Sequence, residues 1–294
     1  MIEFIPQLIA NGIVLGSIYV LVALGLTMVF GIVDVVNFAH GEFYMLGAFV
    51  AFLVVDHLGV PYLPAVLVTG VGTAVFGFAT EKILIRPLRL RNPHPINYVL
   101  VTVGLSTFLL NGVNVLFGPD LRKIPSPFMK QILHFSNVYL TVQRLLVFLV
   151  AVALVSLLAY FVKYTALGSQ MRATAQNFQA ARIVGVNTDR VFFLTFMIGA
   201  ALAGVAGALV GAMFVTEPTM GIHIIVKAFI VVIVGGMGSI SGSIVAGMGL
   251  ALVETLAGAF MPAEFLDIIG FSLMIIVLLT KPTGIFGTKG GASA

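Results

Sequence analysis

Four polar side chains lie within nine positions of the stretch VDVVNFAHGEFYMLG (33–47), which is otherwise strongly apolar. They are Asp34, Asn37, His40 and Glu42. Groups of this kind either hydrogen-bond a polar solute or satisfy one another and fix the start of a helix. Because only 9% of the chain is charged, this cluster is the leading candidate for a functional site.

The composition is that of a membrane protein. The chain has 294 residues, is 60% hydrophobic and contains no cysteine, and its mean hydropathy is +1.15. A soluble domain is about 25% charged, so these few charges cannot cover a water-facing surface. No cleavable signal peptide is expected, because the first apolar run (9–32) is too long. The absence of cysteine excludes disulfides and thiol chemistry.

The apolar segments predict an all-α polytopic membrane protein that forms a single transmembrane domain over residues 1–294. A helix needs about 20 apolar residues to cross a bilayer. Eight segments meet this length approximately, and a shorter one contains Lys227 and ends in GGMG, so the sequence allows eight or nine crossings. The eight are 9–31, 35–55, 62–80, 96–117, 144–162, 191–214, 241–259 and 264–280, and the shorter one is 224–236.

Charge asymmetry favours nine crossings. With nine, the segments 81–95, 163–190 and 281–294 lie on one side and hold most of the 15 basic residues. The positive-inside rule makes that side cytoplasmic. The N-terminus is then expected outside and the C-terminus inside. Close helix packing is expected for AALAGVAGALVGA (200–212), because small residues let membrane helices approach closely.

The polar cluster is expected inside the membrane. The run 43–55 spans only about 20 Å as a helix, so the second span must start earlier, and Asp34 is the expected N-cap. Asn37, His40 and Glu42 then face the protein interior or a wet cavity. Two interpretations remain open: they lock the helix start, or they line a translocation path.

Other charged residues invite simpler interpretations. Glu254 is expected to reach the outer interface from the end of its span, and Lys227 is expected to extend outward. Asp189 and Arg190 are expected to form a local ion pair or cap. A role for Glu254 or Lys227 in a path is the less favoured interpretation.

Enzyme, metal, cofactor and nucleic-acid functions have no support in the sequence. It lacks Ser-His-Asp, paired-carboxylate and metal-ligand spacings, and His57 and His94 are expected on opposite sides of the membrane. It also lacks the phosphate loop G-x-x-x-x-G-K-[ST]. The stretch GGMGSISG (235–242) follows a membrane helix instead of a strand, so we interpret it as a turn between helices. The basic loops are short, so nucleic-acid binding is not indicated.

The longest cytoplasmic segment, 163–190, is expected to carry a helix outside the membrane. Ser169 is the expected N-cap and Gly185 the expected stop of a segment rich in Ala and Gln. The helix is amphipathic and mildly basic, which suits either a surface helix in the headgroups or a docking helix for a soluble partner.

Several motifs resemble LivH-type permease subunits of branched-chain amino acid ABC importers, almost from end to end. Gln179-Ala180-Ala181 followed by Gly185 resembles the "EAA…G" signature of ABC importer permeases, with Gln179 in place of Glu. The other resembling stretches are 25–48, 185–209, 230–242 and KPTGIFG (281–287). Urea and short-chain amide permeases are similar in the same motifs.

The resemblance implies a division of labour in a bacterial inner membrane. A periplasmic binding protein delivers the solute, a second homologous permease completes a heterodimeric pore, and two cytoplasmic ATPases supply energy at the coupling residues Gln179, Ala180, Ala181 and Gly185. This chain is then expected to be no enzyme and to bind no cofactor. A permease for urea or amides, an autonomous channel or secondary transporter, and a scaffolding protein without a path are the alternatives.

Overall fold

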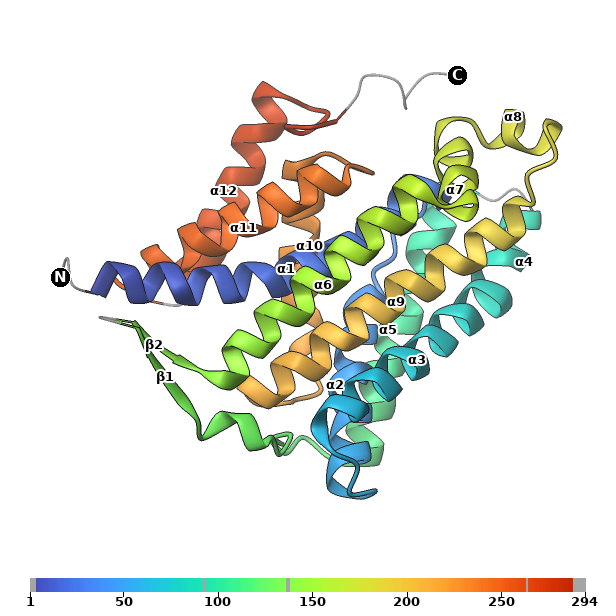
Figure 1. Ribbon diagram of the computed structural model, residues 1–294. Coiled ribbons are helices and arrows are strands. Elements are labelled where there is room, and N and C mark those ends of the chain that lie inside the picture. The colour runs from blue at the N-terminus through green and yellow to red at the C-terminus, as the bar shows by residue number, and fades with distance from the viewer. Residues whose placement is uncertain (1–3, 92–93, 136–137, 263, 288–294) are drawn as a thin grey trace.

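The protein is a bundle of membrane helices with a small β-hairpin (Figure 1). The computed structural model describes residues 4–91, 94–135, 138–262 and 264–287. The elements are α1 (Ile5–Val33), α2 (His40–Asp56), α3 (Tyr62–Thr80), η2 (Glu81–Ile85), α4 (Arg86–Leu90), α5 (Pro95–Phe117), η3 (Pro127–Met129), β1 (Ile132–Phe135), β2 (Val138–Thr141), α6 (Val142–Tyr164), α7 (Ala166–Gln176), α8 (Phe178–Ile183), α9 (Thr188–Met213), α10 (Met220–Gly235), α11 (Ile240–Ala257) and α12 (Glu264–Thr280). Each apolar segment predicted from the sequence contains a helix, although the segment 35–55 is helical only from His40.

Within the described ranges, six helical stretches are long and apolar enough to cross a membrane. These are α1, the continuous helix from Tyr62 to Leu90, α5, α6, α9 and α11. The helices α2, α10 and α12 are shorter, with 17, 16 and 17 residues. A 16-residue helix is about 24 Å long, which is less than the hydrocarbon core of about 30 Å.

Helices α1 and α9 form the centre of the bundle and are mostly buried, whereas few residues of α5 and α6 are buried. The centre is closely packed because glycines face one another across helices. A methyl group at Gly25 would lie 2.7 Å from the Gly199 carbonyl oxygen, and one at Gly199 would lie 2.9 Å from the Gly25 carbonyl oxygen. A methyl group at Gly47 would overlap the backbone of Gly204. These contacts confirm the close packing expected for residues 200–212.

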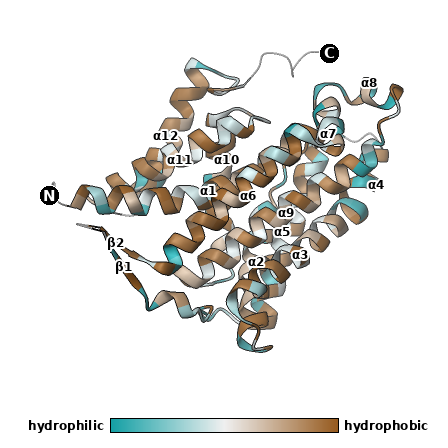
Figure 2. Cartoon of the chain, in the orientation of Figure 1, coloured by the Kyte–Doolittle hydropathy of each residue, from teal (hydrophilic) through white to brown (hydrophobic). Residues whose placement is uncertain are grey.

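The two ends of the bundle differ. Figure 1 places α4, α7 and α8 at one end and the β-hairpin at the other. Figure 2 shows hydrophilic residues gathered on α4, α7 and α8, while the spans are mainly hydrophobic. The antiparallel hairpin pairs Ile132 with Thr141 and His134 with Tyr139. It is held to the start of α1 by Gln7, whose amide bonds the backbone of Tyr139 at 2.7 and 3.1 Å.

The glycine-rich stretch after α10 is a turn, as predicted. Helix α10 ends at Gly235, and Gly236 and Gly238 adopt φ angles of 105° and 83°. These left-handed conformations favour glycine because it lacks a Cβ. Ser239 then caps α11, accepting a hydrogen bond from the Gly242 N–H at 3.1 Å.

Candidate functional site

Helix α2 begins later than the sequence predicts. Asp34, expected as its N-cap, instead ends α1: its backbone is left-handed (φ 55°) and its N–H donates to the Phe30 carbonyl at 3.0 Å. Aspartate is among the few non-glycine residues that tolerate this conformation. Residues 34–39 are non-helical, and the Asn37 side chain accepts the Ala39 N–H at 3.1 Å before α2 begins at His40. The predicted start of the span at residue 35 is therefore wrong.

The start of α2 lies deep in the bundle. The His40 ring nitrogen Nε2 is 3.1 Å from the Val22 carbonyl oxygen of α1. Val22 is about 26 Å along α1 from Ile5 and about 16 Å from Val33. The segment 34–39 thus turns back alongside α1, so that α2 begins beside the central part of α1 and not at its end. Non-helical backbone at this depth is tolerated where protein buries it or where it lines a cavity.

The start of α10 mirrors this arrangement. Helix α9 ends at Met213, six residues (214–219) are non-helical, and the short helix α10 follows. The two helix starts meet at a pair of glycines. A methyl group at Gly221 would lie 2.7 Å from the Gly41 carbonyl oxygen, and one at Gly41 would overlap the Gly221 carbonyl oxygen. Two short helices therefore have their N-termini in contact inside the protein.

The three predicted path residues are buried at the start of α2: Glu42 faces α10, His40 lies against α1, and Asn37 bonds the Ala39 backbone. Exposure is 0% for Asn37 and His40 and 1% for Glu42. The Glu42 atom Oε1 accepts a hydrogen bond from Ser106 of α5 at 2.9 Å. Asn37 Nδ2, His40 Nδ1 and Glu42 Oε2 have no hydrogen-bond partner among the described residues. Each side chain thus makes one hydrogen bond, with the Ala39 N–H, the Val22 carbonyl or Ser106, and has one atom without a partner among the described residues, so a structural role and a path role both stay predictions.

Helix α5 presents a largely uncovered face. Its main helix contact is with α2, and Phe108, Val115 and Leu116 are strongly exposed. An open hollow of about 470 Å³ lies over this face between Thr107 and Leu116. Asn111 lies in the hollow and donates to the Thr107 carbonyl at 2.8 Å. Polar side chains facing lipid at this depth are costly, so this face is suited to a covering partner.

The predicted docking segment forms two short helices instead of one. Helix α7 starts at Ala166 with Thr165 as its N-cap, so the expected cap at Ser169 is wrong. Asn177 breaks the helix and caps α8, accepting the Ala180 N–H at 2.9 Å. Asparagine favours such caps because its side chain replaces a missing backbone acceptor. Gly185, with φ 86°, ends the segment as predicted.

The signature residues lie on α8 and just after it. Gln179 and Ala180 are not buried, whereas Ala181 is. Ile183 and Val184 are 86% and 77% exposed, although the segment is hydrophilic elsewhere. Large apolar side chains exposed beside a helix end are typical of docking surfaces.

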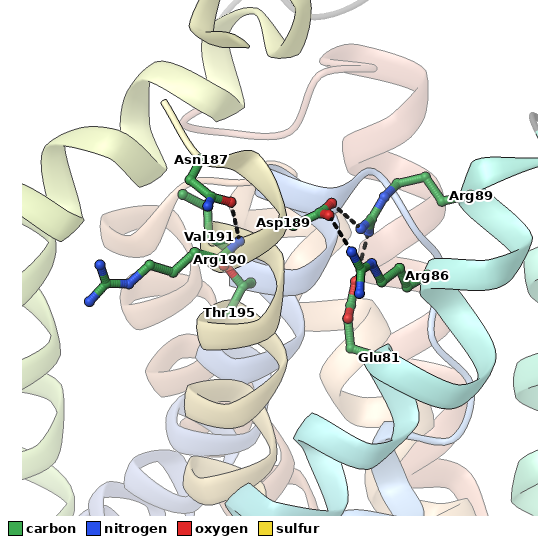
Figure 3. A network of polar contacts seen from close by, with 8 residues as sticks. All are labelled: Glu81, Arg86, Arg89, Asn187, Asp189, Arg190, Val191 and Thr195. Carbon is green, nitrogen blue, oxygen red and sulfur yellow. Dashed lines mark hydrogen bonds and ion pairs between the residues drawn. The ribbon is translucent and has the colours of Figure 1, made fainter. Parts of the chain in front are cut away.

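A charged network joins η2 and α4 to the start of α9 (Figure 3). The Asp189 carboxylate accepts hydrogen bonds from Arg86 at 2.9 Å and from Arg89 at 3.0 Å. Arg89 also donates to the buried Glu81 at 2.9 Å. Arg190 points away from the network. The predicted local ion pair of Asp189 and Arg190 is therefore wrong. Asp189 pairs instead with Arg89 and Arg86, which are 100 and 103 residues away in the sequence.

Aromatic rings connect this network to α8. The rings of Phe178 on α8 and Phe192 on α9 are stacked, with centroids 5.6 Å apart. The Arg89 guanidinium lies 4.2 Å from the Phe192 centroid. This assembly was not predicted from the sequence. The sequence features that could have indicated it are the basic stretch Arg86–Arg91 and the adjacent aromatic residues Phe192 and Phe193.

A second ion network, buried at Glu254, joins the last helices. Lys227 of α10 contacts Glu254 of α11 at 2.5 Å and Asp267 of α12 at 2.7 Å. Tyr19 of α1 donates to Glu254 at 2.8 Å. Glu254 is 3% exposed, so its predicted place at the interface is wrong, and Lys227 turns inward instead of outward. Among the described residues, no group of three acidic or histidine side chains is arranged to hold a metal ion.

Comparison with known proteins agrees with these features. Residues 8–278 match the family described as "Branched-chain amino acid transport system / permease component". The chain is 37% identical to the high-affinity branched-chain amino acid transport system permease protein LivH of Escherichia coli K12, over 97% of this chain and 96% of that protein. It is 33% identical to BraD of Pseudomonas aeruginosa, over 97% and 96%.

A second type of permease protein is also similar. LivM of Escherichia coli K12 is 27% identical over 95% of this chain and 71% of that protein. No solved structure matches the chain. The family match over residues 8–278 and the 37% identity to LivH together establish the family of this chain. This chain belongs to the family of permease components of branched-chain amino acid transport systems.

Proposed function

We propose that this chain is the transmembrane permease subunit of an ATP-binding-cassette importer for the branched-chain amino acids Leu, Ile and Val. The observation that carries the proposal is the match to the permease-component family over residues 8–278. The chain acts as one permease domain, 1–294, in a bacterial inner membrane. It crosses the membrane nine times, with the N-terminus in the periplasm and the C-terminus in the cytoplasm.

Energy comes from partner subunits. The sequence lacks a phosphate loop, and phosphate binding by such ATPases requires one. Two cytoplasmic ATPases drive the transporter, and the surface on which this chain couples to an ATPase is α8 with its flanks: the signature residues Gln179, Ala180, Ala181 and Gly185. The exposure of Ile183 and Val184 at the same end supports this assignment.

A second, homologous permease completes the pore, and a periplasmic binding protein delivers the solute. The similarity of this chain to both LivH and LivM supports two related permeases in one transporter. The uncovered face of α5 supports a partner within the membrane. An isolated bundle would leave Asn111 and Thr107 facing lipid.

The translocation path includes Asn37, His40 and Glu42. Their burial near mid-membrane, with polar atoms that lack partners among the described residues, supports a role beyond fixing the helix start. Ionisable groups in a membrane interior are costly and commonly mark solute paths.

The solute class is tested by uptake competition. Membrane vesicles holding the chain, its partner permease, both ATPases and the binding protein should accumulate labelled leucine when ATP is supplied on the side of the membrane that carries the ATPases. Excess unlabelled isoleucine or valine should inhibit this uptake, whereas urea or acetamide should not. Inhibition by urea or acetamide alone would reassign the chain to an amide permease.

A further inference from the structure

The contact between the starts of α2 and α10 combines a carboxylate with two helix N-termini. Glu42 Oε2 lies 2.9 Å from the position that a Cβ at Gly221 would occupy. Glu42 is in the first turn of α2, and Gly221 is the second residue of α10. Helix N-termini carry the positive end of the helix dipole. In α10 the N–H groups of Met220 and Ile222 donate to the preceding turn at 3.3 and 3.0 Å, so the dipole is the main source of this positive potential. The negative Glu42 carboxylate and the positive N-terminal ends of α2 and α10 therefore lie side by side in the interior of the bundle.

The glycines are what make this approach possible. Any side chain at Gly221 would meet the Gly41 carbonyl oxygen and the Glu42 carboxylate, and any side chain at Gly41 would overlap Gly221. The helix starts consequently reach one another with their backbones. A tight backbone approach beside an acidic group is costly unless it serves packing or binding.

Packing alone leaves polar atoms unsatisfied. Glu42 Oε2, His40 Nδ1 and Asn37 Nδ2 have no hydrogen-bond partner among the described residues, and all three residues are essentially inaccessible. Buried polar atoms in folded proteins normally have a partner. The free carboxylate oxygen faces the start of α10, which is the place where an anionic ligand group would bind.

We propose that the junction of Glu42 with the N-termini of α2 and α10 holds the charged head group of the transported amino acid. This inference rests on the proposed function and adds the solute's zwitterionic group to it. The Glu42 carboxylate pairs with the ammonium group, and the positive N-terminal end of α10 attracts the carboxylate group. The apolar side chain needs no polar partner and contacts the surrounding aliphatic residues.

The chemistry is an exchange of partners. Glu42 Oε2 already lies at the positive end of α10. Binding requires α2 and α10 to separate at the Gly41–Gly221 contact. The solute's carboxylate then lies at the start of α10 and its ammonium group pairs with Oε2, so no charge is left unpaired. Discontinuous helices with N-termini at mid-membrane bind anionic solute groups in other transporter folds. Ser106 keeps the other carboxylate oxygen in place at 2.9 Å.

The first test replaces the charge without changing the shape. Complete transporters carrying Glu42→Gln are compared with Asp56→Asn, a matched change at the exposed end of the same helix. We expect Glu42→Gln to reduce ATP-driven leucine uptake more than about tenfold, with the melting temperature and subunit composition unchanged, and Asp56→Asn to retain uptake. Normal uptake in Glu42→Gln, or parallel loss of assembly and uptake, would overturn the inference.

The second test measures the field at the junction directly. The chain contains no cysteine, so Ser106→Cys introduces a single thiol beside Glu42. We expect a cationic methanethiosulfonate reagent to modify it faster than an anionic one, Glu42→Gln to remove that preference, and leucine to slow the reaction during turnover. Val152→Cys, on the exposed face of α6, serves as the lipid-facing control.

Two results of the thiol experiment count against the inference. One is a thiol at position 106 that is as unreactive as the thiol at position 152, and the other is a reactive thiol at position 106 without charge preference. Either leaves the proposed function intact if the wild-type complex still imports leucine. Absence of ATP-driven leucine uptake by the wild-type complex would instead contradict the proposed function itself.

Discussion

The guanidinium group of Arg89 lies over the ring of Phe192, 4.2 Å from its centroid. Arg89 comes from the end of the third membrane helix, whereas Phe192 belongs to α9 and stacks on Phe178 of the docking helix α8. A planar guanidinium can stack on a ring and bind two carboxylates at once. This contact therefore ties the surface proposed for ATPase docking to the helix that runs from Tyr62 to Leu90.

Replacing Arg89 with Lys should weaken this tie. Lysine keeps the positive charge but cannot stack or bind both Glu81 and Asp189 with the same geometry. We expect the free energy of unfolding to fall by about 1–3 kcal/mol and the ATP hydrolysed per imported leucine to rise. Arg190→Lys, at the neighbour of Asp189 that points away, is the control and should match wild type. Equal behaviour of the two variants would exclude a special role for Arg89.

Removing the Phe178 ring should loosen the docking helix. Phe178→Ala deletes the stack on Phe192, which in proteins contributes about 0.5–1.5 kcal/mol beyond area burial. We expect fewer ATPase subunits to co-purify with the permease and leucine uptake to decline, with Phe178→Tyr close to wild type. Undiminished co-purification of the ATPases with Phe178→Ala would show that the stack does not orient α8.

The Lys227–Glu254 pair should show strong coupling. Glu254→Gln leaves the Lys227 charge with only the half-exposed Asp267, and removing one partner of a buried pair costs about 3–5 kcal/mol. The double variant Lys227→Met/Glu254→Gln should be less destabilised than the sum of the single variants. Thermal unfolding of the purified chain measures all three, and additive effects would mean that the pair is not energetically linked.

Glycine contacts should separate two otherwise similar substitutions. Gly47→Ala places a methyl group into the Gly204 backbone, whereas Gly249→Ala, also within a membrane helix, meets nothing within 4 Å. Overpacking costs about 1–3 kcal/mol, so Gly47→Ala should lower the melting temperature. Gly249→Ala should leave it unchanged or raise it slightly, since alanine favours helices. A tolerated Gly47→Ala would imply that α2 and α9 separate easily.

Labelling from each side of the membrane tests the orientation. In the cysteine-free chain, Val184→Cys and Leu121→Cys create exposed thiols near opposite ends of the bundle. An impermeant maleimide should label the Leu121→Cys variant in intact cells and the Val184→Cys variant only after the cells are opened. The reverse pattern would invert the proposed topology.

The sequence was sufficient to predict the helices but not all their boundaries. Apolar runs of about 20 residues identify membrane helices because lipid requires the backbone to bond internally. Asp34 illustrates why the boundaries were harder to predict. Aspartate can start or end a helix, and here it ends α1, while α2 begins six residues later where His40 contacts Val22. Asn177 divides the segment 163–190 into two helices because its side chain caps α8. The good helix formers around it predicted one continuous helix instead.

The candidate site was predictable in part. Asn37, His40 and Glu42 stand out because they are polar in an apolar segment. Their approach to Gly221, almost 180 residues later, depends on how two discontinuous helices meet, which residue spacing does not reveal. The partners of Asp189 and Glu254 were missed for the same reason: the nearest charges in the sequence are not the nearest in space.

The most direct test of the account is leucine uptake by purified components in liposomes. The chain alone should import nothing, with or without ATP. The chain with its second permease, two ATPases and binding protein should accumulate leucine only when ATP is hydrolysed. ATP-independent leucine transport by the chain alone would contradict the account, because it would make this protein a channel or secondary transporter.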